Sequence, residues 1–174
     1  MSHTVIRRTE MVGASLNLGG QPLDLTEYST TGLMALAVGP RGFGKTNAGL
    51  LMAEQLSEQG WVSVLIDPEG ELESVYGAAV ADAEELRQRL TLRDVPIVVV
   101  SAKDALDFIP YGQVILEVAD ELRKPLFVCI DEGQLFSAAR KRADGVGEAC
   151  DIIAQFAERG RKRALDLFVT ALRY

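Results

Sequence analysis

With 174 residues, the chain is long enough for one domain with a sizeable core and too short for two comfortable ones. Hydrophobic residues make up 48% and charged residues 25%, and no apolar run approaches the ~18–20 residues of a membrane span. The formal net charge of −7 excludes a broad basic face for nucleic acid, so any DNA contact must be local. We expect a single domain over residues 1–174 and, because the N-terminus has no signal-peptide stretch, a cytoplasmic protein.

Residues 1–32 are polar and turn-rich, and we expect an N-terminal extension with short edge strands. From residue 33 onward, short apolar runs alternate with helical patterns. Continuous apolar strands are typical of a parallel sheet with helices on both faces. The sequence therefore predicts a three-layer α/β domain with a mostly parallel central sheet. The predicted strands are 33–38, 61–66, 96–100, 126–130 and 165–170, and the predicted helices are 45–59, 81–92, 112–123 and 145–159.

The most specific motif is residues 39–46, Gly-Pro-Arg-Gly-Phe-Gly-Lys-Thr, which match the phosphate-loop (P-loop) pattern at every fixed position. The glycines let backbone N–H groups turn toward phosphates, and the N-terminus of the following helix favours an anion. Lys45 would reach the β- and γ-phosphates, and the Thr46 hydroxyl would ligate Mg²⁺. We predict bound ATP with Mg²⁺, GTP remaining open, and a catalytic role for Lys45. The predicted nucleotide-binding residues are Gly39, Pro40, Arg41, Gly42, Phe43, Gly44, Lys45, Thr46 and Asn47.

A second motif is the apolar run 126–130, which includes Cys129 and ends in Asp131 and Glu132. In a P-loop domain, an acid at the tip of such a strand lies across from the Thr46 hydroxyl. We therefore predict that Thr46 and Asp131 are the metal ligands. Glu132 would face the γ-phosphate and act as the general base toward water. The base pocket is not located, although Tyr28, Tyr76 and Tyr111 are candidates to stack on adenine.

Two other classes of P-loop protein, GTPases and small-molecule kinases, share some of these sequence features. Residues 67–70, Asp-Pro-Glu-Gly, match the Asp-x-x-Gly pattern of GTPases, and 101–103, Ser-Ala-Lys, resemble their guanine-side loop. A GTPase also needs Asn-Lys-x-Asp, which the chain lacks, and that scheme has no role for Asp131-Glu132. A small-molecule kinase would not need Glu132, although Arg140–Arg142 could imitate its arginine-bearing lid.

In this order, the motifs resemble those of the HerA/FtsK-type ATPases, which are P-loop DNA translocases that include conjugation and viral genome-packaging ATPases. Residues 67–71 are similar to the family's Asp-Pro-x-Gly-Glu, and 131–134, Asp-Glu-Gly-Gln, are similar to its Asp-Glu-Ala-His. Residues 158–165 resemble the basic turn that enters the family's next strand. The resemblance spans residues 33–173.

The resemblance implies a RecA-like fold in which strand 165–170 separates the P-loop strand from the acidic strand. It also implies ATP hydrolysis coupled to movement of double-stranded DNA by a homo-oligomer, usually a hexamer. An arginine from the neighbouring subunit commonly completes such a site. Arg161 is our candidate for this catalytic role, and Arg159 is the alternative.

The chain departs from the family at its last strand, where a polar sensor, typically Gln followed by Arg-Pro, is replaced by Leu172, Arg173 and Tyr174. Leucine cannot hydrogen-bond a phosphate, and Thr170 could substitute for the sensor. A RecA-like sheet also continues with another strand, which residues 5–18 or another subunit could supply. The acidic charge and Leu172 favour an alternative function, a nucleotide-dependent switch or assembly factor that acts on a protein partner.

Overall fold

The central sheet has five strands, in the spatial order β3-β7-β6-β4-β5. The computed structural model describes residues 14–28, 32–136 and 144–172, with the backbone alone at 159 and 161–163. All neighbouring strands of this sheet pair in parallel, in agreement with the predicted fold class. In chain order the strands are β3 (Met34–Val38), β4 (Val62–Asp67), β5 (Ile97–Ser101), β6 (Leu126–Ile130) and β7 (Leu165–Ala171).

The middle strands are apolar because both of their faces are covered. Every residue of β4 and of β6 is buried, as expected for parallel strands between two layers of helices. Strand β7 pairs with β3 on one side and with β6 on the other. The strand that leads into the P-loop is therefore separated from the acidic strand by β7, which is the order that the RecA-like resemblance implies.

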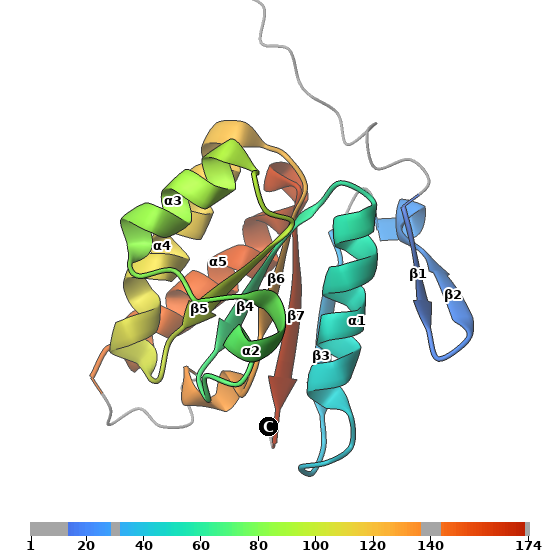
Figure 1. The fold of residues 1–174 in the computed structure, drawn as a ribbon, viewed down its shortest axis with the longest axis horizontal. Coiled ribbons are helices and arrows are strands. Elements are labelled where there is room, and N and C mark those ends of the chain that lie inside the picture. Colours follow the sequence, from blue (N-terminus) through green and yellow to red (C-terminus); the bar gives the residue numbers. More distant parts are fainter. Residues whose placement is uncertain (1–13, 29–31, 137–143, 173–174) are drawn as a thin grey trace, which may run out of the picture.

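Helices form the two outer layers (Figure 1). One layer consists of α3 (Ala83–Leu92), α4 (Ala105–Leu122) and α5 (Val146–Arg163). Its core contains Phe108, whose ring centroid lies 5.0 Å from that of Phe136. Helix α1 (Lys45–Glu58) covers the opposite face, over a second core that contains Leu56 and Phe127. A short helix, α2 (Glu73–Tyr76), follows β4 and had no counterpart in the sequence prediction.

The N-terminal part of the described chain forms a hairpin of its own, so residues 15–18 do not supply the additional strand of the main sheet, which was one of two possibilities. Strand β1 (Ser15–Leu18) pairs antiparallel with β2 (Gln21–Asp24), and a 3-10 turn, η2 (Leu25–Tyr28), follows. Gln55 of α1 accepts from Asn17 N at 2.6 Å and donates to Asn17 O at 3.0 Å. The backbone groups of β1 are thus used by β2 and α1. Residues 5–13 lie outside the described chain.

Helix α4 begins at Ala105 and contains Pro110, whereas the sequence predicted a helix that starts at residue 112. The Asp104 carboxylate accepts a hydrogen bond from Asp107 N at 3.0 Å and caps the helix. Phe108 in the second turn is fully buried. The cap and this burial outweigh the one helical hydrogen bond that Pro110 removes. The other predicted elements after residue 32 are present, with ends shifted by at most four residues. In the described part of the chain, no helix is both long and apolar enough to cross a membrane.

Candidate nucleotide-binding site

Residues 39–46 form the turn between β3 and α1, at the carboxyl edge of the sheet. Gly42 and Gly44 have φ angles of 80° and 77°, which side chains with a Cβ rarely adopt, and Gly44 is the N-cap of α1. Gly39 N donates to Ala171 O at 3.2 Å and ties the start of the loop to the end of β7. The loop therefore has the strand–turn–helix context that a phosphate-binding backbone requires.

One side chain of this loop closes the turn, and several others face solvent. The Lys45 ammonium donates to Gly39 O and to Pro40 O, both at 2.9 Å, so it spans the loop on the inside of the turn. Arg41 and Asn47 are exposed, and Phe43 is 77% exposed.

The two sequence motifs meet at Thr46 and Asp131. The Thr46 hydroxyl donates to Asp131 Oδ1 at 3.1 Å, from the first turn of α1 to the end of β6. The Thr170 hydroxyl of β7 donates a hydrogen bond to the same carboxylate oxygen. It also accepts a hydrogen bond from Glu132 N at 3.0 Å. Thr170 therefore orients both acidic residues, and the strand order explains why: β7 lies between β3 and β6.

The donor atoms at this point suit Mg²⁺. Thr46 and Asp131 offer hydroxyl and carboxylate oxygens, the ligands that this hard cation prefers. Among the described residues, no cluster of three or more His, Cys, Asp or Glu could hold a metal by itself. A small protein ligand set of this kind fits Mg²⁺, which usually keeps several waters and takes its other ligands from substrate phosphates.

Glu132 directly precedes the short turn η3 (Gly133–Leu135) and is half-buried beside β7. Its backbone lies in the left-handed region, with φ 50°. The Gln134 side-chain amide donates to Glu132 Oε2, and Gln134 Oε1 accepts from Leu172 N at 3.2 Å. Gln134 was not among the predicted site residues. Its position two residues after Glu132, where the family has His, was the available signal.

Asp67 stabilises the turn that follows β4. It is 2% exposed, and its carboxylate accepts from Gly70 N at 3.0 Å and from Leu72 N at 2.8 Å. The carboxylate thus holds the turn after β4. An Asp-x-x-Gly acid of the GTPase type would instead have to face the phosphates, so this geometry disfavours that alternative.

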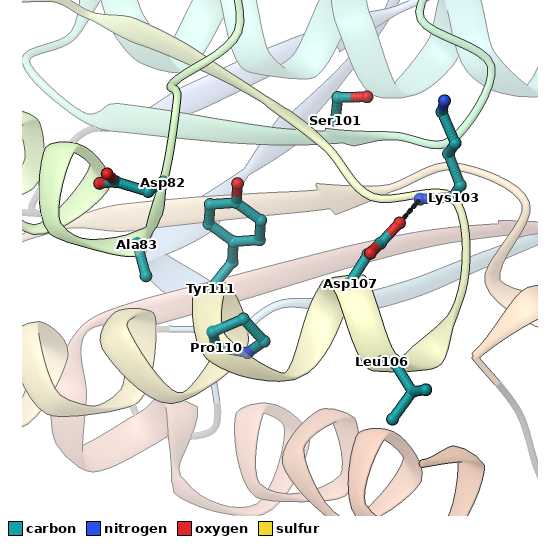
Figure 2. Close-up of a pocket in the computed structure, with 8 residues that line it drawn as sticks. All are labelled: Asp82, Ala83, Ser101, Lys103, Leu106, Asp107, Pro110 and Tyr111. Atoms are coloured by element: carbon teal, nitrogen blue, oxygen red, sulfur yellow. Dashed lines mark hydrogen bonds between the residues drawn. The ribbon is translucent and has the colours of Figure 1, made fainter. Parts of the chain in front are cut away.

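A groove of about 500 Å³ lies at the carboxyl end of β5 (Figure 2). In it, Lys103 N donates to Asp107 Oδ2 at 3.3 Å, and Tyr111 is one of the lining residues. Burial raises the pKa of Tyr111, and the charges of Asp82 and Asp107 raise it further. Strands β7, β6 and β4 separate β5 from β3. The segment resembling a guanine-side loop, residues 101–103, is therefore remote from the P-loop.

Some of the predicted residues fall outside the described part of the chain, and one of the tyrosines has a partner of its own. The side chains of Arg159 and Arg161 lie outside the described residues, as do residues 140–142. Of the candidate adenine-stacking tyrosines, Tyr76 donates through its hydroxyl to Glu54 Oε1 at 2.6 Å, on the outer side of α1.

Several solved structures resemble this chain in fold, although no sequence comparison finds a match. No protein-family model and no curated protein sequence matches the chain. Among solved structures, the genome packaging NTPase B204 from Sulfolobus turreted icosahedral virus 2, in complex with ATPγS, is similar at TM-score 0.59 and 17% identity. EccC (ATPases 2 and 3) of Thermomonospora curvata is similar at TM-score 0.57 and 14% identity. The conjugation coupling protein TcpA of pCW3 is similar at TM-score 0.51 and 14% identity.

The alignments cover most of this chain but only part of each neighbour. They cover 82%, 92% and 98% of this chain against B204, EccC and TcpA respectively. The corresponding shares of those chains are 66%, 29% and 51%. These likenesses, together with the parallel sheet and the loop between β3 and α1, show that the chain has the three-layer α/β fold of the P-loop NTPases.

Proposed function

We propose that this protein is an Mg²⁺-dependent ATPase, and that it acts as an oligomeric motor on double-stranded DNA. The observation that carries the ATPase part is the contact between Thr46 and Asp131 at 3.1 Å, directly beside the P-loop and Glu132. These are the groups that bind phosphate, hold a divalent cation and activate water in P-loop hydrolases. The neighbours in complex with ATP analogues, such as B204, support ATP as the nucleotide.

In the proposed site, the backbone of residues 39–46 surrounds the β-phosphate, and Lys45 turns from its loop carbonyls to the β- and γ-phosphates. Thr46 and Asp131 hold Mg²⁺, which when bound offsets the negative charge of the phosphate oxygens. Glu132 accepts a proton from the attacking water as the water oxygen bonds to the γ-phosphorus. The bond from that phosphorus to the β–γ bridging oxygen breaks, and ADP and phosphate leave.

The DNA part of the proposal draws on different support. B204 is a genome packaging NTPase and TcpA is a conjugation coupling protein, and the motifs resemble those of DNA translocases. The net charge of −7 requires the contact to be local, through segments such as 140–142 and 158–165. An arginine of a neighbouring subunit, Arg161 or Arg159, completes the site in the proposed homo-oligomer.

The test is steady-state ATP hydrolysis by the full chain with Mg²⁺, with and without double-stranded DNA, beside Glu132→Gln and Lys45→Ala. We expect turnover that DNA stimulates. Glu132→Gln should retain ATP binding and lose about 10²–10⁴-fold in turnover, the usual contribution of a general base. Lys45→Ala should weaken ATP binding.

Each outcome bears on a different part of the proposal. Unchanged turnover in Glu132→Gln would remove that residue from the mechanism, and full ATP affinity in Lys45→Ala would contradict the P-loop assignment. ATP binding with slow turnover that DNA does not alter would favour a nucleotide switch acting on a protein. ADP formation that requires an added acceptor would favour a small-molecule kinase.

A further inference from the structure

The side-chain amide of Gln134 is oriented by the backbone at the end of β7. Leu172 N donates to Gln134 Oε1 at 3.2 Å, so the oxygen end of the amide faces β7. The other end, Nε2, carries only donors and meets Glu132 Oε2, which can only accept when the carboxylate is ionised. The amide has a unique orientation as a result, because the reverse one would set its oxygen against the Glu132 carboxylate.

The turn that bears Gln134 is fixed against the same strand. A Cβ added at Gly133 would lie 2.3 Å from Val169 Cγ1 and 3.2 Å from Thr170 O, so this turn packs on β7 more closely than any other residue would allow. Leu135 N donates to Glu132 O at 2.8 Å, and the next side chain, Phe136, is fully buried. Gln134 therefore projects from a well-held backbone.

Glu132 is in turn held at both of its ends by groups tied to β7. Its N–H donates to the Thr170 hydroxyl at 3.0 Å, and its carboxylate receives the Gln134 amide. Leu172, which stands where a polar sensor was expected, contributes only its backbone N–H. Thr170 of β7 meets the backbone N–H of Glu132, whereas the side chain that meets the Glu132 carboxylate comes from the β6–α5 connection.

We propose that Gln134 is the positioning residue for Glu132, and that it takes the place of the polar side chain missing at Leu172. This proposal rests on the proposed function, in which Glu132 accepts a proton from water. A fixed N–H donor engages one carboxylate oxygen and so orients the other oxygen toward the water. Without it, the carboxylate would sample several rotamers, and few of them would be productive.

The experiment compares Gln134→Ala and Gln134→Glu in the full chain, with ATP hydrolysis measured as kcat and KM and with binding of a fluorescent ATP analogue. Gln134→Ala should lower kcat by about 10–100-fold, as loss of an orienting partner does, with little change in KM or analogue affinity. The control is Gln113→Ala, because Gln113 also donates to a glutamate, Glu148, at 2.9 Å, but on the exposed α4–α5 surface. That variant should match the wild type.

Gln134→Glu adds a pH-dependent readout. At neutral pH the new carboxylate repels Glu132, and kcat should fall below that of Gln134→Ala. A protonated carboxylic acid has the amide's shape, with an O–H donor and a C=O acceptor, and two adjacent carboxylates favour keeping one proton, so its kcat relative to wild type should rise as the pH falls. A change that depends on pH within one folded protein is not explained by misfolding.

Two results would overturn the proposal while leaving the proposed function intact. One is a wild-type kcat in Gln134→Ala when Glu132→Gln is inactive. The other, which decides the matter if the alanine variant does not fold, is a relative activity of Gln134→Glu that does not rise at low pH. Full turnover in Glu132→Gln would instead contradict the proposed function itself.

Discussion

Thr46 and Asp131 are 85 positions apart in the sequence, and the hydroxyl of the first donates to the carboxylate of the second at 3.1 Å. The contact exists because α1 starts beside the carboxyl ends of β6 and β7. It joins the P-loop to the acidic strand and leaves oxygen atoms of both motifs at one point. The same contact makes the metal dependence of the proposed activity testable.

Replacing the Thr46 hydroxyl should change how much Mg²⁺ the reaction needs. In Thr46→Ala, an oxygen ligand and a hydrogen-bond donor to Asp131 are both lost, so the Mg²⁺ concentration for half-maximal ATP hydrolysis should rise about 10–100-fold. Thr46→Ser keeps the hydroxyl and should stay near the wild type. A titration of ATPase activity with Mg²⁺ checks both variants, and equal Mg²⁺ requirements in Ala and Ser would contradict the assignment.

Local pattern was sufficient to predict the strands and the two motifs. The run 126–130 is apolar at every position, and the observed strand has these bounds. The first turns of α4 were missed, and the burial of Phe108, which helps the helix to tolerate Pro110 there, is a tertiary effect. The partners of Gln134 could not be predicted, because they depend on how closely the turn after β6 approaches the end of β7.

We expect that Gly49 of α1 cannot be replaced by a larger residue without a loss of stability. A Cβ there would lie 2.6 Å from Cys129 Sγ and 2.9 Å from Phe168 Cδ1, where helix and sheet pack directly. Gly49→Ala should therefore lower the free energy of unfolding by about 1–3 kcal/mol, the usual cost of overpacking. Gly147 of α5 is the control, since no atom lies within 4 Å of its added Cβ.

Gly147→Ala should be neutral or stabilise the protein by up to about 1 kcal/mol, because alanine loses less conformational entropy than glycine in a helix. Urea unfolding of the two variants measures the difference. Two equal effects would mean that α1 can move away from the sheet at little cost, contrary to the packing seen around Gly49.

Two arginines at helix ends form a matched pair for a second stability test. Arg93 after α3 and Arg123 after α4 both have left-handed backbones, with φ 53° and 52°. The Arg93 guanidinium donates to Gly60 O at 2.9 Å and to Pro125 O at 3.2 Å, and so ties the segments that enter β4 and β6. Arg123 is exposed.

Arg93→Gly relieves the backbone but loses charge-assisted hydrogen bonds to two carbonyls, so we expect a net loss of about 1–2 kcal/mol in unfolding free energy. Arg123→Gly should be neutral or stabilise by up to about 1 kcal/mol, since only the backbone relief remains. Thermal unfolding of both variants provides the comparison. Equal behaviour would show that the Arg93 guanidinium contributes nothing measurable.

Cys129 is only 3% exposed, because its side chain is packed in the core between α1 and the sheet. Burial raises the pKa of its thiol above the ordinary value of 9.0, and the nearby charge of Asp131 raises it further. Below pH 9 the thiol is protonated in both the folded and the unfolded chain and does not affect their balance. Above pH 9 the unfolded chain loses this proton and the folded chain keeps it, so stability falls as the pH rises.

One such group lowers the free energy of unfolding by at most about 1.4 kcal/mol per pH unit. Cys129→Ala should remove it and flatten the decline in unfolding free energy between pH 8.5 and 10, even if the variant is less stable at neutral pH. Cys150→Ala is the control, because Cys150 is only half-buried. Tyr76 adds a decline of the same sign, since burial and the Glu54 carboxylate raise its pKa above the ordinary 10.0. The Cys129 effect must therefore be read as the difference between the two cysteine variants, and identical slopes would mean that the thiol ionises in the folded protein.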